Sequence, residues 1–271
     1  MRYGLISDVH ANLPALDAAL GALAGAKVQG LLCAGDLVGY GPHPNECVER
    51  LTEVGARCVA GNHDLIAIGR LSLERTDALA RRTLEWTREA ISPATREALE
   101  GLPPLVEENG LVMTHGAIDD PQQYVLTDSQ AQGQLDRLAR ELPAARVLVL
   151  GHTHAARAYA TGRGARRLRP AGRVRLDGSG PFLLNPGSVG QARERRPVAR
   201  AAVLDLEQRG EVSFLALRYD HARTVSDLVA RGLPPGAAHR KPTLRRKAGA
   251  LKAALRRGSQ AARGRTSGRT S

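Results

Sequence analysis

Five short motifs in the chain combine histidine with aspartate, asparagine and glycine, residue types that hold metal ions and transfer protons. The chain contains only eight histidines, and five of them lie in these motifs. The motifs are Asp8-Val9-His10, Gly35-Asp36, Gly61-Asn62-His63-Asp64, Thr114-His115-Gly116 and Gly151-His152-Thr153-His154. Carboxylate, amide and imidazole donors without a thiolate suit manganese, iron, zinc or a similar transition ion better than calcium or magnesium.

The spacing within the motifs predicts that their side chains converge. Residues i and i+2 of an extended segment project to the same side, so Asp8 with His10, and His152 with His154, can each direct two donors to one place. The adjacent glycines let the chain turn sharply and approach an ion closely. Each motif follows a predicted strand, and ligands of open α/β sheets bind beyond the carboxyl ends of the strands. We therefore expect one shared site.

The number of donors predicts two ions rather than one, because a single ion rarely takes seven protein ligands. Asp36 is the carboxylate that we expect to bridge the ions. Two dications against two carboxylates leave an excess of positive charge that favours an anionic phosphoester. A bound ion also lowers the pKa of water from near 16 to about 7, which makes a hydroxide available at neutral pH. The donor set therefore predicts metal-dependent hydrolysis of a phosphoester.

The net charge of +12 lies almost entirely at the end of the chain. Residues 240–271 contain eleven Lys and Arg and no acidic residue, so the preceding part is close to neutral. Large apolar residues become rare after Pro235, and we predict a domain over residues 1–235 and a disordered basic tail over 236–271. Such a tail either contacts nucleic acid or an anionic membrane, or is simply solvated. A weak apolar stripe could form a surface-binding helix within it, at Leu244, Ala248, Leu251 and Leu255.

Length and cysteine usage indicate the general class of the protein. A chain of 271 residues can bury a core without disulfides. The three cysteines, Cys33, Cys47 and Cys58, form no Cys-x-x-Cys pair, which favours a reducing compartment. The first apolar run is too short for a signal peptide, and no stretch reaches membrane-spanning length. We therefore expect a cytoplasmic protein, whose oligomeric state the sequence leaves open.

The elements that must position the motifs follow from apolar patterning and turn residues. In the first half, short apolar runs alternate with helical stretches, which predicts βαβ units. We expect strands at residues 2–7, 28–34 and 57–60, a helix at 13–24, and a second helix capped by Asn45 and ending at Val54. A polar helical region follows at 65–102, with Ser92 as an N-cap. The second half is expected to contain a hairpin at 105–114 around Asn109-Gly110, a helix at 129–142, a strand at 146–150, and a hairpin at 198–206 and 211–218.

The five motifs, in this order, resemble those of the calcineurin-like metallophosphoesterases over roughly residues 1 to 220. The later segment Asn185-Pro186-Gly187-Ser188-Val189 is similar to the small bacterial phosphodiesterase branch. The resemblance implies an α/β fold, a four-layer α/β/β/α sandwich of two mixed sheets flanked by helices. It implies one ion held by Asp8, His10 and His154, another held by Asn62, His115 and His152, and Asp36 as the bridge. His63 corresponds to a non-ligand histidine that contacts the phosphate and protonates the leaving group.

The resemblance implies a hydrolase, most simply a phosphodiesterase, in which a metal-bound hydroxide attacks phosphorus in line. Manganese is the expected ion, with iron, zinc, cobalt and nickel as alternatives. Phosphoprotein phosphatases and one class of dinucleoside tetraphosphate hydrolases carry an arginine shortly after the bridging aspartate. The segment Gly35 to Gly41 has none, which favours diesters unless an arginine of the 193–196 cluster substitutes. The expected substrate is a small or nucleotide-like phosphoester.

Several alternatives stay open at this point. The same site could hydrolyse dinucleoside polyphosphates or phosphomonoesters, and the same fold could serve as a non-catalytic scaffold. The scaffold is less favoured because His63 and every ligand are present. Asn185 and Ser188 are predicted to contact the substrate, with a purely turn-forming role as the alternative. Asp64 is expected to orient its loop or a neighbouring ligand, and His43 to be an exposed loop residue, with contact to the substrate as the alternative.

Overall fold

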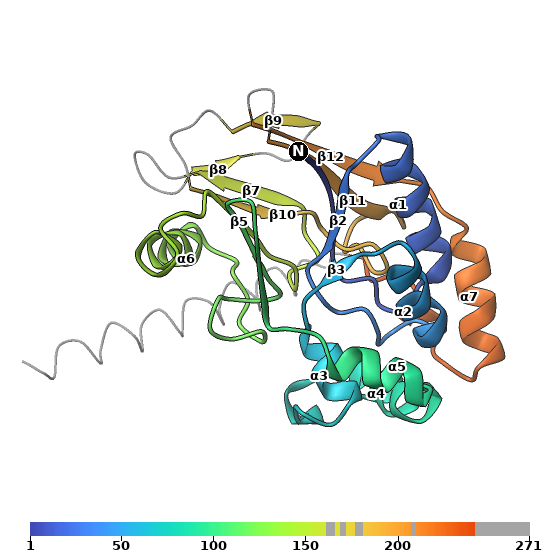
Figure 1. Cartoon of the computed structure of the whole chain (residues 1–271). Coiled ribbons are helices and arrows are strands. Elements are labelled where there is room, and N and C mark those ends of the chain that lie inside the picture. The colour runs from blue at the N-terminus through green and yellow to red at the C-terminus, as the bar shows by residue number, and fades with distance from the viewer. Residues whose placement is uncertain (161–165, 169–171, 177–180, 207–209, 242–271) are drawn as a thin grey trace, which may run out of the picture. The chain divides into compact units, whose positions relative to one another are not determined.

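The computed structural model describes residues 1–160, 166–168, 172–176, 181–206 and 210–241. Residues Met1–Arg240 form one compact unit. Two six-stranded sheets make up its centre, and they lie side by side in Figure 1. The predicted tail, with the stripe that begins at Leu244, lies outside the described residues except for positions 236–241, of which 236–240 belong to the compact unit.

The first sheet is built around the N-terminal strand and is mixed. Its order is β3-β2-β1-β11-β12-β9. The strands are β1 (Arg2–Ile6), β2 (Gly30–Cys33), β3 (Arg57–Cys58), β9 (Arg173–Arg175), β11 (Ala199–Asp205) and β12 (Glu211–Leu217). The first three are parallel, and β11, β12 and β9 continue the sheet in antiparallel pairs. Because β1, β2 and β3 are parallel, their carboxyl ends meet at one edge.

The second sheet is also mixed, in the order β4-β5-β6-β10-β7-β8. The strands are β4 (Leu105–Glu108), β5 (Leu111–Thr114), β6 (Val147–Val149), β7 (Arg157–Ala160), β8 (Arg166–Leu168) and β10 (Phe182–Asn185). Strands β5, β6 and β10 are parallel, and the remaining pairs are antiparallel. The ends of β5 and β6 therefore also meet at one edge of their sheet.

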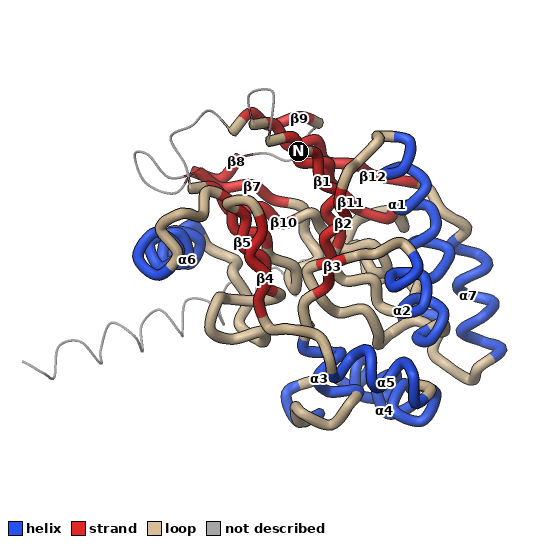
Figure 2. The backbone as a smooth tube through the Cα atoms, viewed as in Figure 1, coloured by secondary structure: helices blue, strands red, loops and turns tan. Residues whose placement is uncertain are grey.

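Helices cover the outer faces of both sheets, as Figure 2 shows in blue. Those beside the first sheet are α1 (Leu13–Gly25), α2 (Pro44–Glu53) and α7 (His221–Ala230), and α6 (Asp128–Glu141) packs on the second. Next to these, α3 (Asn62–Ala67), α4 (Ala78–Ala90) and α5 (Pro93–Glu100) form a helical group with the short η1 (Leu73–Arg75). A last 3-10 turn is η2 (Pro235–Ala237). Within the described ranges, no helix has the length and apolar character needed to span a bilayer.

Side chains that alternate along each strand build three apolar layers. Tyr3 and Leu5 point between the sheets and meet residues of the second sheet such as Val149. Ile6 points to the opposite side, toward α1 and α2, and Leu148 of the second sheet points toward α6. Apolar contact on both faces of both sheets gives the order α/β/β/α. The four-layer fold that the resemblance implies is confirmed.

Most predicted elements are confirmed, with ends shifted by one or a few residues. The hairpin between β4 and β5 turns through Asn109 at φ 49° and Gly110 at φ 77°, as its dipeptide predicts. Ser92 caps α5, because its side-chain oxygen accepts a hydrogen bond from the Thr95 backbone N–H at 3.1 Å. The helical region at 65–102 is divided among α3, η1, α4 and α5. Strands β7 to β10 and helix α7 were not predicted.

The prediction that Asn45 caps α2 is wrong. His43 occupies the N-cap position, without a side-chain cap hydrogen bond. Asn45 lies within the helix, where its amide donates to the Ala90 carbonyl at 2.9 Å and its Oδ1 accepts from the Ser92 N–H at 2.8 Å. A tertiary contact with the turn between α4 and α5 therefore outweighs the local capping preference of asparagine.

Candidate metal centre

The five motifs lie directly after β1, β2, β3, β5 and β6, at the edges where the carboxyl ends of these strands meet. Several of their residues adopt left-handed backbone conformations. These are Asp8, His10, Asp36, His152 and His154, with φ of 52°, 49°, 55°, 63° and 55°. The assumption that these segments are extended is therefore wrong, although their side chains do converge. Residues with a Cβ enter this region at a cost of about 1 kcal/mol or more each, a strain typical of functional sites.

Backbone hydrogen bonds hold the strained loops in place. The Asp8 N–H donates to the Gly35 carbonyl and the His10 N–H to the Asp36 carbonyl, both at 2.9 Å. The Gly190 N–H donates to the Asp8 carbonyl at 3.0 Å. The loops after β1, β2 and β10 therefore fix one another, and the position of each side chain depends on all three.

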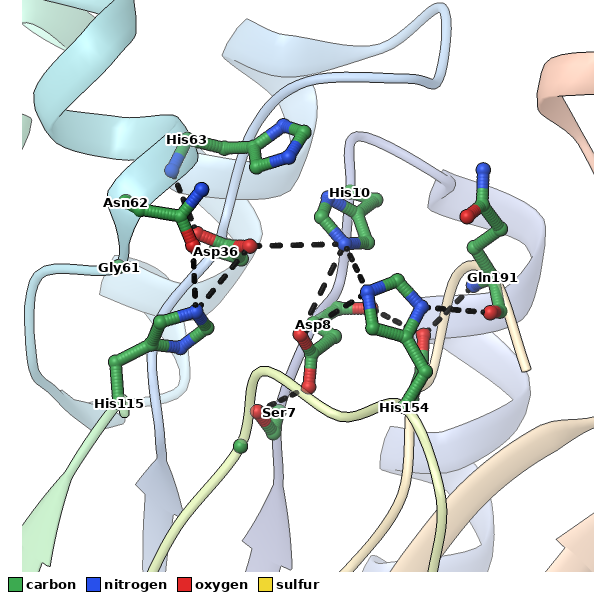
Figure 3. Close-up of polar contacts among 12 residues, drawn as sticks. Ser7, Asp8, His10, Asp36, Gly61, Asn62, His63, His115, His154 and Gln191 are labelled. Atoms are coloured by element: carbon green, nitrogen blue, oxygen red, sulfur yellow. Dashed lines mark hydrogen bonds and ion pairs between the residues drawn. The ribbon is translucent and has the colours of Figure 1, made fainter. Parts of the chain in front are cut away.

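One donor cluster consists of Asp8, His10 and His154, all buried (Figure 3). The His154 Nε2 lies 3.4 Å from Asp8 Oδ1, and the His10 Nε2 lies 3.8 Å from the same oxygen. The two Nε2 atoms are 3.1 Å apart. The residues predicted to hold one ion therefore present their ligand atoms to a common point.

A second donor cluster consists of Asp36, His115 and His152. The His115 Nε2 lies 3.3 Å from Asp36 Oδ2 and 3.1 Å from the Asn62 Oδ1. Asn62 is the first residue of α3. Asn62, His115 and His152, which are predicted to hold the other ion, therefore lie together beside Asp36.

Asp36 lies between the two clusters. Figure 3 shows its carboxylate between the rings of His10 and His115. Its Oδ2 is 3.7 Å from the His10 Nε2 as well as near His115, and its Oδ1 accepts a hydrogen bond from the His63 backbone N–H at 2.8 Å. A third cluster, Asp36 with His10 and His63, places the His63 ring at the same carboxylate. Asp36 is therefore within reach of both donor sets.

Backbone carbonyls orient the four imidazoles. The ring nitrogens that face carbonyls are Nδ1 of His10 (Val38, 3.2 Å), Nδ1 of His115 (Ala34, 2.7 Å), Nδ1 of His154 (Gln191, 2.8 Å) and Nε2 of His152 (Gln122, 3.1 Å). A carbonyl only accepts, so each of these nitrogens carries the hydrogen. In a neutral ring the other nitrogen then presents a lone pair, as a metal ligand must.

The charge states of the site suit a cation. Burial lowers the pKa of His10, His152 and His154, that of His152 to about 3, so these rings are neutral at pH 7. Burial raises the pKa of Asp8 to about 7. At His115 burial disfavours the charged form, but the carboxylates of Asp36 and Asp8 outweigh it and raise the pKa to about 9. The carboxylates therefore favour positive charge at the position where His115 meets Asp36.

An unpartnered oxygen also indicates that a cation fits this site. Asp8 Oδ1 is buried and has no hydrogen-bond partner, whereas its Oδ2 accepts from the Ser7 hydroxyl at 2.6 Å. An unpaired buried carboxylate oxygen is unfavourable unless an ion or a donor compensates it. Oxygen and imidazole donors without a thiolate match a divalent transition ion.

Asp64 and Gly61 keep Asp36 in position. Asp64 accepts hydrogen bonds from the N–H groups of Leu37 at 2.8 Å, Val38 at 3.1 Å and Gly61 at 2.9 Å. The expectation that it orients the loop is confirmed. A Cβ on Gly61 would collide with the carboxylate and backbone of Asp36, so only glycine allows the loops after β2 and β3 to approach so closely.

Asn185 and Ser188 lie against the site, but their polar atoms bond protein groups. The Asn185 amide donates to the Gly151 carbonyl at 2.6 Å and the Thr153 hydroxyl at 3.2 Å. The Ser188 hydroxyl donates to the Asp8 carbonyl at 2.8 Å and accepts from the Gln191 N–H at 2.8 Å. Both side chains therefore brace loops that carry residues of the donor clusters. Substrate contact by either residue stays a prediction.

Sequence reasoning placed Tyr40 beside the site, with stacking on a base and packing in its turn as alternatives, but it missed Tyr124 and misjudged His43. The Tyr40 ring lies 4.8 Å from the rings of both His10 and His63, and Tyr124 stacks on His152 at 3.8 Å. Aromatic residues make up only 3% of the chain, and this rarity is the sequence feature that could have pointed to Tyr124. His43 is 6% exposed and pairs with Asp227 of α7 at 3.0 Å, so its predicted exposure is wrong.

Comparison with known proteins gives one consistent family. The calcineurin-like phosphoesterase superfamily domain matches residues 1–209. An uncharacterized protein of Methanocaldococcus jannaschii is 29% identical over 236 residues, covering 85% of this chain and 93% of that protein. The crystal structure of a metallophosphoesterase from Sphaerobacter thermophilus is 31% identical and covers 88% of this chain and 96% of its own, with a TM-score of 0.73. A hypothetical protein from Pyrococcus horikoshii, at 19% identity, the same coverages and a TM-score of 0.70, shares the fold.

Proposed function

The chain belongs to the calcineurin-like phosphoesterase superfamily, and from this premise we propose that it is a dinuclear metal-dependent phosphodiesterase. Membership supports a metal-dependent phosphoester hydrolase. The dinuclear centre, the preference for diesters and the role of each residue are parts of the proposal. The observation that carries it is the Asp36 carboxylate, which faces imidazole nitrogens of both donor clusters at 3.3 and 3.7 Å.

In this proposal Asp8, His10 and His154 hold one ion, Asn62, His115 and His152 hold the other, and Asp36 bridges them. Bound divalent ions would supply Lewis acidity and a deprotonated water at neutral pH. Manganese is the ion that we propose, since the donor set contains oxygen and nitrogen but no thiolate. Three free cysteines support a reducing, cytoplasmic setting.

His63 is the group that we propose as the proton donor to the leaving oxygen. Its Nδ1 is buried and has no hydrogen-bond partner. The backbone N–H of His63 is held by Asp36 Oδ1, so the ring has a fixed position beside the clusters. Tyr40 packs against the ring at 4.8 Å and limits its movement. A fixed imidazole that lies in one cluster with Asp36 and His10 is suited to general acid catalysis.

The substrate is proposed to be a small or nucleotide-like phosphodiester. The segment from Gly35 to Gly41 contains no arginine, so nothing in it can clamp a terminal phosphate with two hydrogen bonds. A diester carries one charge fewer than a monoester dianion and needs less neutralisation. The basic tail is proposed to bring the enzyme to polyanions such as nucleic acid or an anionic membrane.

The test is hydrolysis of an aryl phosphodiester and an aryl phosphomonoester by metal-stripped protein resupplied with manganese. We expect two manganese ions per chain, turnover of the diester that needs the metal, and loss of turnover in Asp36→Asn. Asp136→Asn, an exposed position on α6, is the matched control and should keep full activity. Binding of a single ion would contradict the dinuclear centre, and preferential turnover of the monoester would contradict the diester assignment.

A further inference from the structure

Arg193 is a cation beside the first donor cluster, and no acidic residue in the described part of the chain lies within ion-pair distance of it. It is half-buried, and its Nε is buried without a hydrogen-bond partner. The neighbouring Glu194 is held by Arg200 instead, through contacts of 2.6 and 2.9 Å. Across the described ranges of the chain, Arg193 forms no ion pair. A half-buried guanidinium without an anionic partner is unfavourable, so an anion that binds here would be stabilised.

The backbone that carries Arg193 is fixed to both sides of the first donor cluster. The Val189 N–H donates to the Ser7 carbonyl at 3.0 Å, and Gly190 and Ser188 both bond the Asp8 carbonyl. The Gln191 carbonyl, two residues before Arg193, accepts from the His154 ring at 2.8 Å. Two residues span at most about 7 Å, so the start of the Arg193 side chain lies close to His154.

The charge of Arg193 acts on residues from different parts of the site. Burial is the largest cause of the lowered pKa of His154 and of His63, and the Arg193 cation lowers both further. It also opposes the effect of burial on Asp8 and Tyr40, whose pKa values burial raises. The guanidinium therefore lies within electrostatic reach of a predicted ligand set and of the proposed proton donor.

We propose that Arg193 binds a non-bridging oxygen of the substrate phosphate. The inference rests on the proposed function, which it deepens by naming the group that recognises the anion. Arginine suits this task because its planar N–H groups match phosphate oxygens and its charge is permanent. The guanidinium comes from the loop after β10 and contacts a non-bridging oxygen, which diesters and monoesters share, so it adds affinity for phosphate without deciding between them.

Kinetics of three variants test this assignment. Arg193→Met removes the charge and keeps the apolar part of the side chain. Arg193→Lys keeps a positive charge but loses the planar pair of N–H groups. Arg195→Met is the control, because it removes an exposed arginine of the same loop. We expect kcat/KM for the diester to fall roughly 10- to 100-fold in Arg193→Met, to recover in part in Arg193→Lys, and to stay unchanged in Arg195→Met. Equal activity of Arg193→Met and wild-type protein, with matching Tm values, would overturn the assignment.

A binding measurement makes the test independent of turnover. Calorimetric titration of the manganese-loaded protein with inorganic phosphate should give a Kd that is about 10-fold weaker in Arg193→Met, while the affinity for manganese stays the same. Unchanged phosphate binding would overturn the assignment, as would weaker manganese binding alone, because Arg193 would then only support the ligands. If wild-type protein hydrolyses neither ester yet Arg193→Met still binds phosphate more weakly, the proposed function fails and the anion site stands.

Discussion

His63 is the residue whose role is least fixed by its surroundings. Its ring lies within a cluster that also contains Asp36 and His10, so geometry alone allows it to be a ligand. The resemblance instead implies a proton donor. The two roles differ in what remains when the ring is removed, because a lost ligand reduces metal binding and a lost acid reduces only the chemical step.

We predict that His63→Ala keeps two manganese ions per chain and lowers kcat by about 10²- to 10⁴-fold, the usual contribution of a general acid. Metal content by elemental analysis and kcat with the diester check this. His221→Ala, which removes a histidine of α7, is the control and should match wild-type protein in both. Loss of one ion in His63→Ala would show that His63 is a ligand.

Asn185 offers a test between substrate contact and support of a loop. Its amide bonds the Gly151 carbonyl and the Thr153 hydroxyl on either side of His152, and its Oδ1 accepts from the Gly187 N–H at 2.9 Å. All these contacts are buried, and outer hydrogen bonds of this kind typically change metal affinity by about 10- to 100-fold.

We predict that Asn185→Leu weakens manganese binding by about 10-fold or more, while KM at saturating manganese stays within about 2-fold of the wild-type value. Manganese titration and diester kinetics measure the two effects separately. A raised KM with unchanged manganese affinity would instead support the prediction that Asn185 contacts the substrate.

The residues of the two donor clusters could be expected to converge because they occur in local motifs. Asp36 follows a glycine, and Asp8 and His154 each lie two residues from another donor, His10 and His152. The roles of Tyr40 and Arg193 depend on distant partners, since Tyr40 packs on His63 and the loop of Arg193 is tied to Asp8 and His154. Such contacts leave no local pattern.

At the scale of elements, the loop after β2 and the start of α3 approach each other closely in the site. Gly61 is the N-cap of α3, at an ordinary extended φ of −92°. Its importance is steric, because an added Cβ would meet the Asp36 carboxylate and backbone N. One of the two elements would have to move, and Asn62 and Asp36 would separate.

We predict that Gly61→Ala weakens manganese binding by at least about 10-fold and destabilises the protein by roughly 1 to 3 kcal/mol, as overpacking does. Gly133→Ala is the matched control. Gly133 lies in the exposed part of α6 with no atom near an added Cβ, so alanine there should raise stability by about 0.5 to 1 kcal/mol. Denaturant unfolding and manganese titration check both variants. Normal manganese affinity in Gly61→Ala would contradict the steric argument.

Elements with strong apolar patterns were predictable and short ones were not. The runs that form β1, β2 and β6 are apolar on both faces because both faces are buried. Strand β7 has the sequence Arg-Ala-Tyr-Ala, which has little β propensity of its own. It is a strand because it pairs with β10. Asn45 shows the same effect in a helix, where a contact with the α4–α5 turn replaces the predicted cap.

At the scale of the whole molecule, the C-terminal part of the compact unit covers one side of the site. Ala237 and Ala238 are buried against Tyr40 and Leu233. The Ala237 carbonyl accepts from the Gln191 side chain at 2.8 Å, and Gln191 also bonds His154. These residues lie beyond the predicted domain end at residue 235, because composition alone does not reveal that small apolar side chains are packed.

Arg240 connects the segment of residues 236–240 to the helical group that contains α4. It pairs with Asp77, the N-cap residue of α4, at 2.7 Å, and its side chain is only 11% exposed. Burial opposes its charge, but Asp77 and Tyr40 raise its pKa. The contacts of residues 236–240 therefore contribute to the stability of the compact unit, whereas the sequence after Lys241 carries nine Lys and Arg and no acidic residue, which is most of the net charge of +12.

Two truncations separate these contributions. Ending the chain after Lys241 should leave Tm and hydrolysis of small diesters unchanged, and should abolish binding to a polyanion such as single-stranded DNA together with its steep salt dependence. Ending it after Pro235 should in addition destabilise the protein by about 2 kcal/mol, through lost burial and hydrogen bonds, and lower Tm by roughly 4 to 8 °C. Thermal unfolding, diester kinetics and DNA binding at two salt concentrations measure these effects.

Equal Tm values for the two truncations would show that residues 236–240 contribute nothing to stability. DNA binding that survives both truncations would place the polyanion site on the folded unit instead of the tail.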